Sequence, residues 1–176
     1  MLKTTRKISF ARNLMTLQSG EVVMQSSRVL AIGVFDLFHI GHLRYLQFAR
    51  KQGQHLSVAI SPDWMVVAGK HKLPVIGEAQ RREMLAGLGW IDAIDWVPSS
   101  SENTGPAAQW IAQWGIDHVI AGGEWQGSAR WLRLTPALAE RGIRVTFAPH
   151  TPDISSSLIA AKCRLLGAVT SPELTT

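Results

Sequence analysis

The sequence holds a single cysteine, Cys163, among its 176 residues, which leaves no internal disulfide and no cysteine metal cluster to build. So little cysteine suits a reducing compartment, and we expect a cytoplasmic protein. No stretch of apolar residues is long enough to predict a membrane span. Charged residues make up 18% of the chain and apolar residues 46%, a balance that excludes a disordered protein. This length corresponds to one compact domain.

The net charge of +5 is concentrated near the N-terminus. Residues 1–27 carry four basic side chains and one acid, Glu21, which leaves a net charge of only +2 for the rest of the chain. A body this close to neutral argues against a nucleic-acid partner. We expect residues 1–27 to be a disordered basic extension, residues 28–166 to be the folded domain, and residues 167–176 to be a C-terminal tail.

Apolar runs and helical spacing alternate after residue 27. Strands are predicted over 29–34, 56–60, 93–97, 118–121 and 143–147. Helices are predicted over 41–50, 78–88, 106–114 and 155–166, and a short helix is predicted between Thr135, as its N-cap, and Gly142. This order predicts an α/β fold, with a Rossmann-like, doubly wound sheet of five parallel strands. Ligands bind such sheets at the carboxyl ends of the strands.

The loop after the first predicted strand contains two histidines, His39 and His42, on either side of Gly41. A helix is expected to begin there, and a helix N-terminus presents unpaired N–H groups and partial positive charge to a phosphate. Imidazole N–H groups at the same place can donate to phosphate oxygens on which charge develops. One histidine would be explained as a helix cap or a packing residue, but the pair favours a catalytic site.

Residues 33–42, Gly-Val-Phe-Asp-Leu-Phe-His-Ile-Gly-His, resemble the signature Gly-Thr-Phe-Asp-x-x-His-x-Gly-His of the cytidylyltransferase group of nucleotidyltransferases. The resemblance continues over residues 28–163 and implies the HxGH nucleotidyltransferase fold for the domain at 28–166. The catalytic residues that it implies are His39, His42, Lys70 and Lys72. The nucleotide-binding residues that it implies are Val34, Phe35, Gly41, Gly123, Glu124, Trp125, Ile154, Ser155, Ser156 and Ser157, and the acceptor-binding residues are Asp36 and Arg81.

Three later segments carry the resemblance further. The lysines lie in a loop expected over 68–74, where family lysines clamp phosphates, although a solvated surface loop would look the same. Gly123-Glu124-Trp125 resembles the Gly-x-Asp-Trp segment that lines the base and ribose pocket, with Trp131 as a weaker candidate for covering that pocket. Residues 154–157 resemble the Ile-Ser-Thr-Thr segment and form a second helix N-terminus suited to an anion. An exposed ion pair is the alternative for Arg81.

The resemblance is strongest to the glycerol-3-phosphate cytidylyltransferases. It implies transfer of CMP from CTP to a small phosphorylated alcohol, with release of pyrophosphate and formation of a CDP-alcohol. Mg²⁺ is expected to bind with the nucleotide rather than to a set of protein ligands, and a homodimer is implied.

Two alternatives remain, because the chain departs from the family pattern. In these enzymes an arginine that would contact the acceptor phosphate stands at the position of Gly89. This arginine is also often absent from the sugar-phosphate relatives. An adenylyltransferase of the ADP-heptose synthase type, using ATP and a sugar phosphate, is therefore the first alternative. Val34, Glu124 and His150 replace the usual Thr, Asp and Arg. Such changes would suit a non-catalytic nucleotide-binding module, the second alternative.

Overall fold

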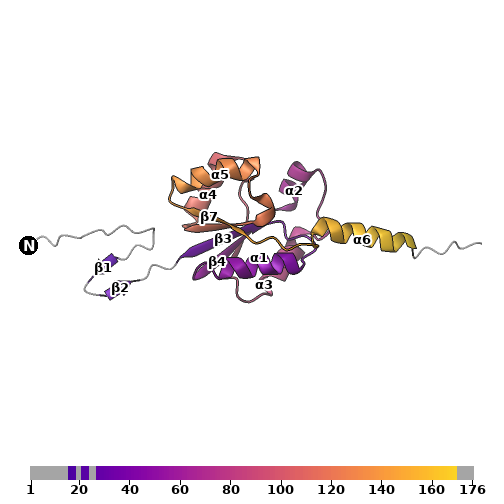
Figure 1. Cartoon of the computed structure of the whole chain (residues 1–176), viewed down its shortest axis with the longest axis horizontal. Coiled ribbons are helices and arrows are strands. Elements are labelled where there is room, and N and C mark those ends of the chain that lie inside the picture. The colour runs from indigo at the N-terminus through magenta and orange to yellow at the C-terminus, as the bar shows by residue number, and fades with distance from the viewer. Residues whose placement is uncertain (1–15, 19–20, 24–26, 170–176) are drawn as a thin grey trace, which may run out of the picture.

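Five parallel strands form the centre of the molecule (Figure 1). The computed structural model describes residues 16–18, 21–23 and 27–169. The strands are β3 (Arg28–Gly33), β4 (His55–Ile60), β5 (Ala93–Trp96), β6 (His118–Gly122) and β7 (Arg144–Ala148), in the spatial order β5-β4-β3-β6-β7. From β3 the chain adds β4 and β5 on one side, and it then returns to add β6 and β7 on the other side, so the switch point lies between β3 and β6. The predicted doubly wound, five-stranded parallel sheet is therefore confirmed.

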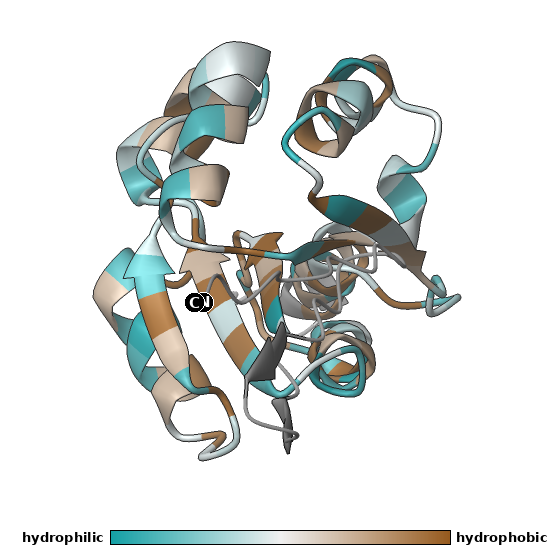
Figure 2. Cartoon of the chain, turned by 90° about the vertical axis from the view of Figure 1, so that its left-hand side faces the viewer, coloured by the Kyte–Doolittle hydropathy of each residue, from teal (hydrophilic) through white to brown (hydrophobic). Residues whose placement is uncertain are grey.

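Helices cover both faces of this sheet. On one face lie α1 (Ile40–Arg50) and α3 (Glu78–Ala86), and on the other lie α4 (Thr104–Gln113) and α5 (Ala129–Ala139) (Figure 1). Each face has its own apolar core: Leu46 and Leu85 pack on the first, and Trp110 and Leu134 on the second. Apolar residues run along the central strands, whereas the helices carry polar residues on their outer surfaces (Figure 2). Burial on both faces explains why the strands have continuous apolar sequences.

The strands β3 and β6 separate beyond the pair Ala31–Ile120, and the hydroxyl of Tyr45 lies between them. This hydroxyl donates to the carbonyl oxygen of Ile120 at 2.7 Å and accepts from the N–H of Ile32 at 3.0 Å. Burial raises the pKa of Tyr45 well above its ordinary value, so the hydroxyl keeps its proton. The side chain thus satisfies two backbone groups at the point where the sheet opens.

We expect Tyr45→Phe to lower the free energy of unfolding by about 1–3 kcal/mol, because it leaves the Ile32 N–H and the Ile120 carbonyl without their partner. Urea denaturation of the variant and the natural chain measures the difference. A change of only a few tenths of a kcal/mol would show that water replaces the hydroxyl there.

Several elements differ from the predictions. Helix α2 (Asp63–Lys70), which buries Met65, was not predicted, and its last three residues lie in the loop expected over 68–74. Helix α5 starts six residues before Thr135, so Thr135 is not its N-cap. The stabilisation from burying Trp131, Leu134 and Leu138 on one helix face outweighs the cost of Pro136 inside the helix. No helix among the described residues is long and apolar enough to cross a membrane.

The two ends of the chain also differ from their predicted boundaries. Within the predicted extension, β1 (Thr16–Gln18) and β2 (Glu21–Val23) form a two-stranded antiparallel sheet, so regular structure occurs where disorder was expected. Helix α6 (Ser156–Val169) passes the predicted end of the domain at 166 and extends away from the body (Figure 1). Residues 1–15, 19–20, 24–26 and 170–176 lie outside the described residues.

Candidate active site

The first histidine of the pair caps helix α1. His39 has extended backbone angles, with φ −140° and ψ 174°, and its Nδ1 accepts a hydrogen bond from the N–H of Gly41 at 3.1 Å. Because Nδ1 is the acceptor, we place the proton of the neutral ring on Nε2, which is then the nitrogen that can donate to a ligand. Burial lowers the pKa of His39, while Glu124 acts in the opposite direction.

The second histidine lies one helical turn further on and stacks against the first. The ring centroids of His39 and His42 are 3.9 Å apart, with 22° between the ring planes, and Phe35 and Phe38 lie against His42. Burial, with help from neighbouring His39, lowers the pKa of His42 to about 4. Both imidazoles are therefore neutral near pH 7 in the free protein. A bound polyphosphate would favour their charged forms and so raise both pKa values.

Glycine is required at position 41 by close packing. A Cβ atom there would lie 2.9 Å from the ring of His39 and 3.4 Å from Cγ2 of Ile154, just before α6. The absence of a side chain therefore allows α1, the histidine and the start of α6 to meet. Two of the predicted nucleotide-binding residues, Gly41 and Ile154, are neighbours in space although 113 positions separate them.

The start of α6 closes this corner of the site. The hydroxyl of Ser156 donates to the backbone carbonyl of Asp36 at 2.7 Å, and Oγ of Ser155 accepts from the N–H of Leu158 at 3.1 Å. Ser155 thus caps the helix, while Ser156 attaches the helix to the histidine loop. Ser157 is exposed. The N-terminus of α6 lies beside that of α1, and both present partial positive charge at one place.

The lysine-bearing segment begins at the end of α2. Lys70 is the last residue of that helix, His71 follows with a left-handed φ of +53°, and Lys72 lies beyond it. Both lysines are exposed. The charge of Lys70 helps to lower the pKa of His42, which places it within electrostatic reach of the histidine pair. Only part of the expected loop at 68–74 is therefore a loop, because residues 68–70 are helical.

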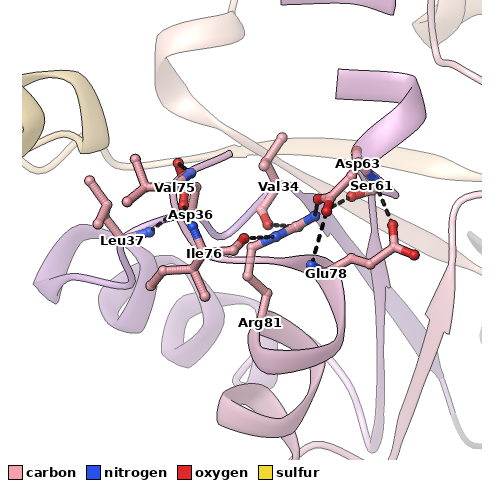
Figure 3. Close-up of polar contacts among 9 residues, drawn as sticks. All are labelled: Val34, Asp36, Leu37, Ser61, Asp63, Val75, Ile76, Glu78 and Arg81. Carbon is pink, nitrogen blue, oxygen red and sulfur yellow. Dashed lines mark hydrogen bonds and ion pairs between the residues drawn. The ribbon is translucent and has the colours of Figure 1, made fainter. Parts of the chain in front are cut away.

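A hydrogen-bonded network beneath these segments holds the two residues expected to bind the acceptor (Figure 3). The side chain of Arg81 is fully buried and donates to the carbonyl oxygens of Val34, Ser61 and Ile76. Its Nη2 also forms an ion pair with Asp63 at 2.6 Å. The alternative of an exposed ion pair is wrong. A direct contact between Arg81 and an acceptor is not supported either, because four protein oxygens already use the guanidinium.

Asp36 belongs to the same network. The side chain is 9% exposed, and its oxygens accept from the backbone N–H groups of Leu37, Val75 and Ile76 at 2.9–3.0 Å. These bonds engage both carboxylate oxygens with the protein's own backbone, which does not support the predicted acceptor contact.

The segment after β6 forms the other wall of the site. A Cβ atom on Gly123 would collide with the carbonyl oxygen of Ala148, so glycine lets η1 (Gly123–Trp125) pack against β7. Trp125 is 38% exposed, and the guanidinium carbon of Arg130 lies 4.2 Å from its ring centroid. The carboxylate of Glu124 acts on the pKa of His39, so this wall and the histidine loop face each other.

Trp131 does not cover this pocket. It is 5% exposed and packs edge-on against Phe147 in the core, which corrects the weaker prediction for this residue. Sequence reasoning also missed Arg130, because α5 was predicted to start later. Ser128, followed by apolar residues at 131, 134 and 138, was the signal for the earlier start.

A third histidine, which is buried in the sheet, matters for stability rather than for the site. His118 in β6 is 3% exposed, its Nε2 lies 2.8 Å from Oγ1 of Thr146, and burial lowers its pKa to about 4. His42 has the same low pKa. In the unfolded chain both groups titrate near 6.5, so between these pH values the unfolded state binds more protons than the folded state.

We therefore expect the free energy of unfolding to be highest above pH 6.5 and to fall as the pH drops from 6.5 towards 4. Urea denaturation across this range measures the slope. The variants His42→Asn and His118→Asn each remove one titrating group and should each flatten the curve. Equal slopes in all three proteins would contradict the assignment to these two histidines.

No group of three or more His, Cys, Asp or Glu side chains that could hold a metal ion lies together among the described residues. Asp36, the carboxylate nearest in sequence to the histidines, is occupied by N–H donors. The residues present fit a metal ion held mainly by its nucleotide, and Mg²⁺ binding of that kind stays a prediction.

The chain resembles known sequences over most of this domain. Residues 30–162 match the model of the family described as cytidylyltransferase-like. The bifunctional protein HldE of Halorhodospira halophila is 41% identical over 99 residues, which are 56% of this chain and 20% of the relative. The bifunctional protein HldE of Erwinia tasmaniensis is 35% identical over 109 residues, 62% of this chain and 21% of the relative. The chain thus spans about a fifth of the length of these curated relatives.

Solved structures share the fold. A lipopolysaccharide core biosynthesis protein from Thermoplasma volcanium superposes with a TM-score of 0.59 at 22% identity, over 72% of this chain and 99% of the other. A pantoate-beta-alanine ligase from Francisella tularensis superposes with a TM-score of 0.54 at 10% identity, over 88% of this chain and 75% of the other. At these identities the likeness supports the architecture alone.

Proposed function

Because the chain belongs to the cytidylyltransferase-like family and is a nucleotidyltransferase, we propose that it transfers a nucleoside monophosphate to a small phosphorylated acceptor. In this reaction an acceptor phosphate oxygen attacks the α-phosphorus of a nucleoside triphosphate, the bond from that phosphorus to the β-phosphate oxygen breaks, and pyrophosphate leaves. The observation that carries the proposal is the meeting of His39, His42 and the N-termini of α1 and α6 at one edge of the sheet.

The side chains suit such a transfer without a covalent enzyme intermediate. Nε2 of His39 can donate to the triphosphate, and His42 gains a proton more easily once that negative charge is bound. Lys70 and Lys72 supply mobile positive charge from the facing segment. Gly123 and Trp125 offer a backbone approach and a flat surface to the base and ribose. Catalysis then depends on positioning and on charge stabilisation.

Mg²⁺ supplies further neutralisation of the triphosphate when it enters with the nucleotide. This role requires no carboxylate cage, in keeping with the engagement of Asp36 by backbone N–H groups.

We infer that ATP is the donor and a sugar phosphate is the acceptor, as in the first alternative from the sequence. The similarity to the HldE proteins fits this choice better than the glycerol-3-phosphate type. Gly89 supports it as well, because position 89 lacks the arginine expected for a phosphorylated alcohol. CTP with a small phosphorylated alcohol is the second candidate, favoured by Trp125 and the serines at the start of α6. Because the matched residues are only about a fifth of the relatives' length, the activity of a whole relative is not carried over to this chain.

Pyrophosphate release from the purified chain with Mg²⁺ tests this proposal. ATP and CTP are each combined with sugar 1-phosphates, glycerol 3-phosphate and phosphorylated amino-alcohols. Turnover with ATP and a sugar phosphate is the expected result, and faster turnover with CTP and a phosphorylated alcohol would overturn the choice of substrates. Tight binding of a nucleotide without turnover by any pair would favour the non-catalytic module.

We also propose a homodimer and a cytoplasmic location, both on the family resemblance and the cysteine content alone. Light scattering of the purified chain measures the mass in solution, and a monomeric mass would refute the dimer.

A further inference from the structure

Asp36 connects three segments that approach the site from different parts of the chain. Its side chain oxygens accept from the N–H groups of Val75 and Ile76, at 3.0 and 2.9 Å, in the stretch that follows the two lysines (Figure 3). Its backbone carbonyl accepts from the hydroxyl of Ser156 at 2.7 Å, at the start of α6. The residue itself belongs to the loop that leads into the histidine pair.

The backbone on either side of Asp36 is strained. Phe35 has a φ of +57° and Leu37 a φ of +46°, both in the left-handed region that non-glycine residues rarely adopt. Such residues persist only where surrounding contacts fix them, and they gather at functional sites. Here the fixing contacts are the carboxylate bonds of Asp36, the bond from Arg81 to Val34 and the burial of the Phe35 ring.

The same contacts fix the lysine segment relative to the histidines. Lys70 and Lys72 are exposed, and in the described part of the chain neither side chain forms a hydrogen bond or ion pair. On the C-terminal side of the lysines, the bonds from Val75 and Ile76 to Asp36 join their segment to the histidine loop. Phosphate clamping requires the lysines and histidines to face one ligand at the same time, so this anchor determines whether they can act together.

We propose that Asp36 is a positioning residue, which holds the histidine loop, the lysine segment and the start of α6 in one arrangement and does not bind the acceptor. This role rests on the proposed function, because the three segments matter together only if they meet a triphosphate and its acceptor. A negatively charged side chain suits the task, since an ionised carboxylate accepts from several N–H donors at once and bonds to them more strongly than a neutral acceptor does.

The test is Asp36→Asn in the full chain. The amide of asparagine has one oxygen in place of two, so its NH₂ group faces an N–H donor of Val75 or Ile76 instead of accepting from it. Hydrogen exchange at these two backbone amides should become about tenfold faster or more. The value of kcat should fall by about 10–100-fold, because the lysines are no longer held opposite the histidines. The KM for the acceptor and the affinity for the nucleoside monophosphate should stay within about twofold.

Asp95→Asn is the matched control. Asp95 is exposed on β5, at the edge of the sheet, and its carboxylate accepts from the N–H of the following residue at 2.8 Å, much as Asp36 does from Leu37. The control makes the same change in charge and should alter neither the exchange at Val75 and Ile76 nor kcat.

Exchange at Val75 and Ile76 that is unchanged in Asp36→Asn would overturn the proposal. A raised acceptor KM with unchanged kcat would overturn it as well, because that pattern indicates direct contact with the acceptor. Failure of the proposed function is distinguishable from both, since the natural chain would then show no turnover while the exchange measurement would still report whether Asp36 anchors the segment.

Discussion

Replacing His42 by alanine is expected to lower kcat by about 10²–10³-fold, the usual effect of removing one group that stabilises charge in a transition state. The loss follows from the position of the ring, stacked 3.9 Å from His39 beside the N-termini of two helices. Nucleotide affinity should change far less, because the predicted base and ribose contacts lie on the separate wall formed by Gly123 and Trp125. Steady-state kinetics together with direct nucleotide binding measures both quantities.

His55→Ala is the matched control for this prediction. His55 begins β4, so it lies at the amino edge of the parallel sheet, opposite the edge that carries the candidate site. The same substitution there should leave kcat within about twofold. If His42→Ala retained more than a tenth of the natural turnover, the histidine pair would not be the centre of the chemistry.

Replacing Arg81 by alanine is expected to lower the free energy of unfolding by about 3–5 kcal/mol. The side chain is fully buried, and its removal leaves Oδ1 of Asp63 and three backbone carbonyls without their donor. Against a typical total of about 5–15 kcal/mol, the change is large enough to unfold part of the population. Urea denaturation followed by circular dichroism gives the value.

Arg82→Ala provides the comparison for this measurement, because Arg82 is the next residue of α3 and its side chain is exposed. It should change the free energy of unfolding by no more than about 0.5 kcal/mol. The loss of free energy of unfolding in Arg81→Lys should lie between the losses in these two variants, since a lysine keeps the charge but cannot reach four acceptors. Equal effects of Arg81→Ala and Arg82→Ala would contradict the buried network.

The parallel sheet and the histidine loop could be predicted because the signals for them are local. A strand buried on both faces must be apolar throughout, and the run before Gly33 has that pattern. The helix after it begins at Ile40 and is capped by His39, whose spacing to Gly41 and His42 is visible in the sequence itself. The family assignment followed from the same ten residues and is confirmed.

The existence of α2 and the start of α5 were harder to predict from the sequence. Helix α2 is eight residues long and is stabilised chiefly by the burial of Met65 and Val66, which is a tertiary effect. Helix α5 includes Pro136, a strong local signal for a helix start, and only its buried face explains why the helix begins earlier.

By itself the sequence determined the fold class, the family and the pair of histidines, because strand burial, helix capping and a compact motif depend on neighbouring residues. Only the tertiary structure decided what Asp36 and Arg81 do. Their chemistry suits an acceptor phosphate as well as it suits backbone groups, and the choice depends on partners 20 to 47 positions away, such as Val34, Ser61 and Ile76. Hydrogen bonds between segments so distant in the chain become visible only when the loops have met at the edge of the sheet.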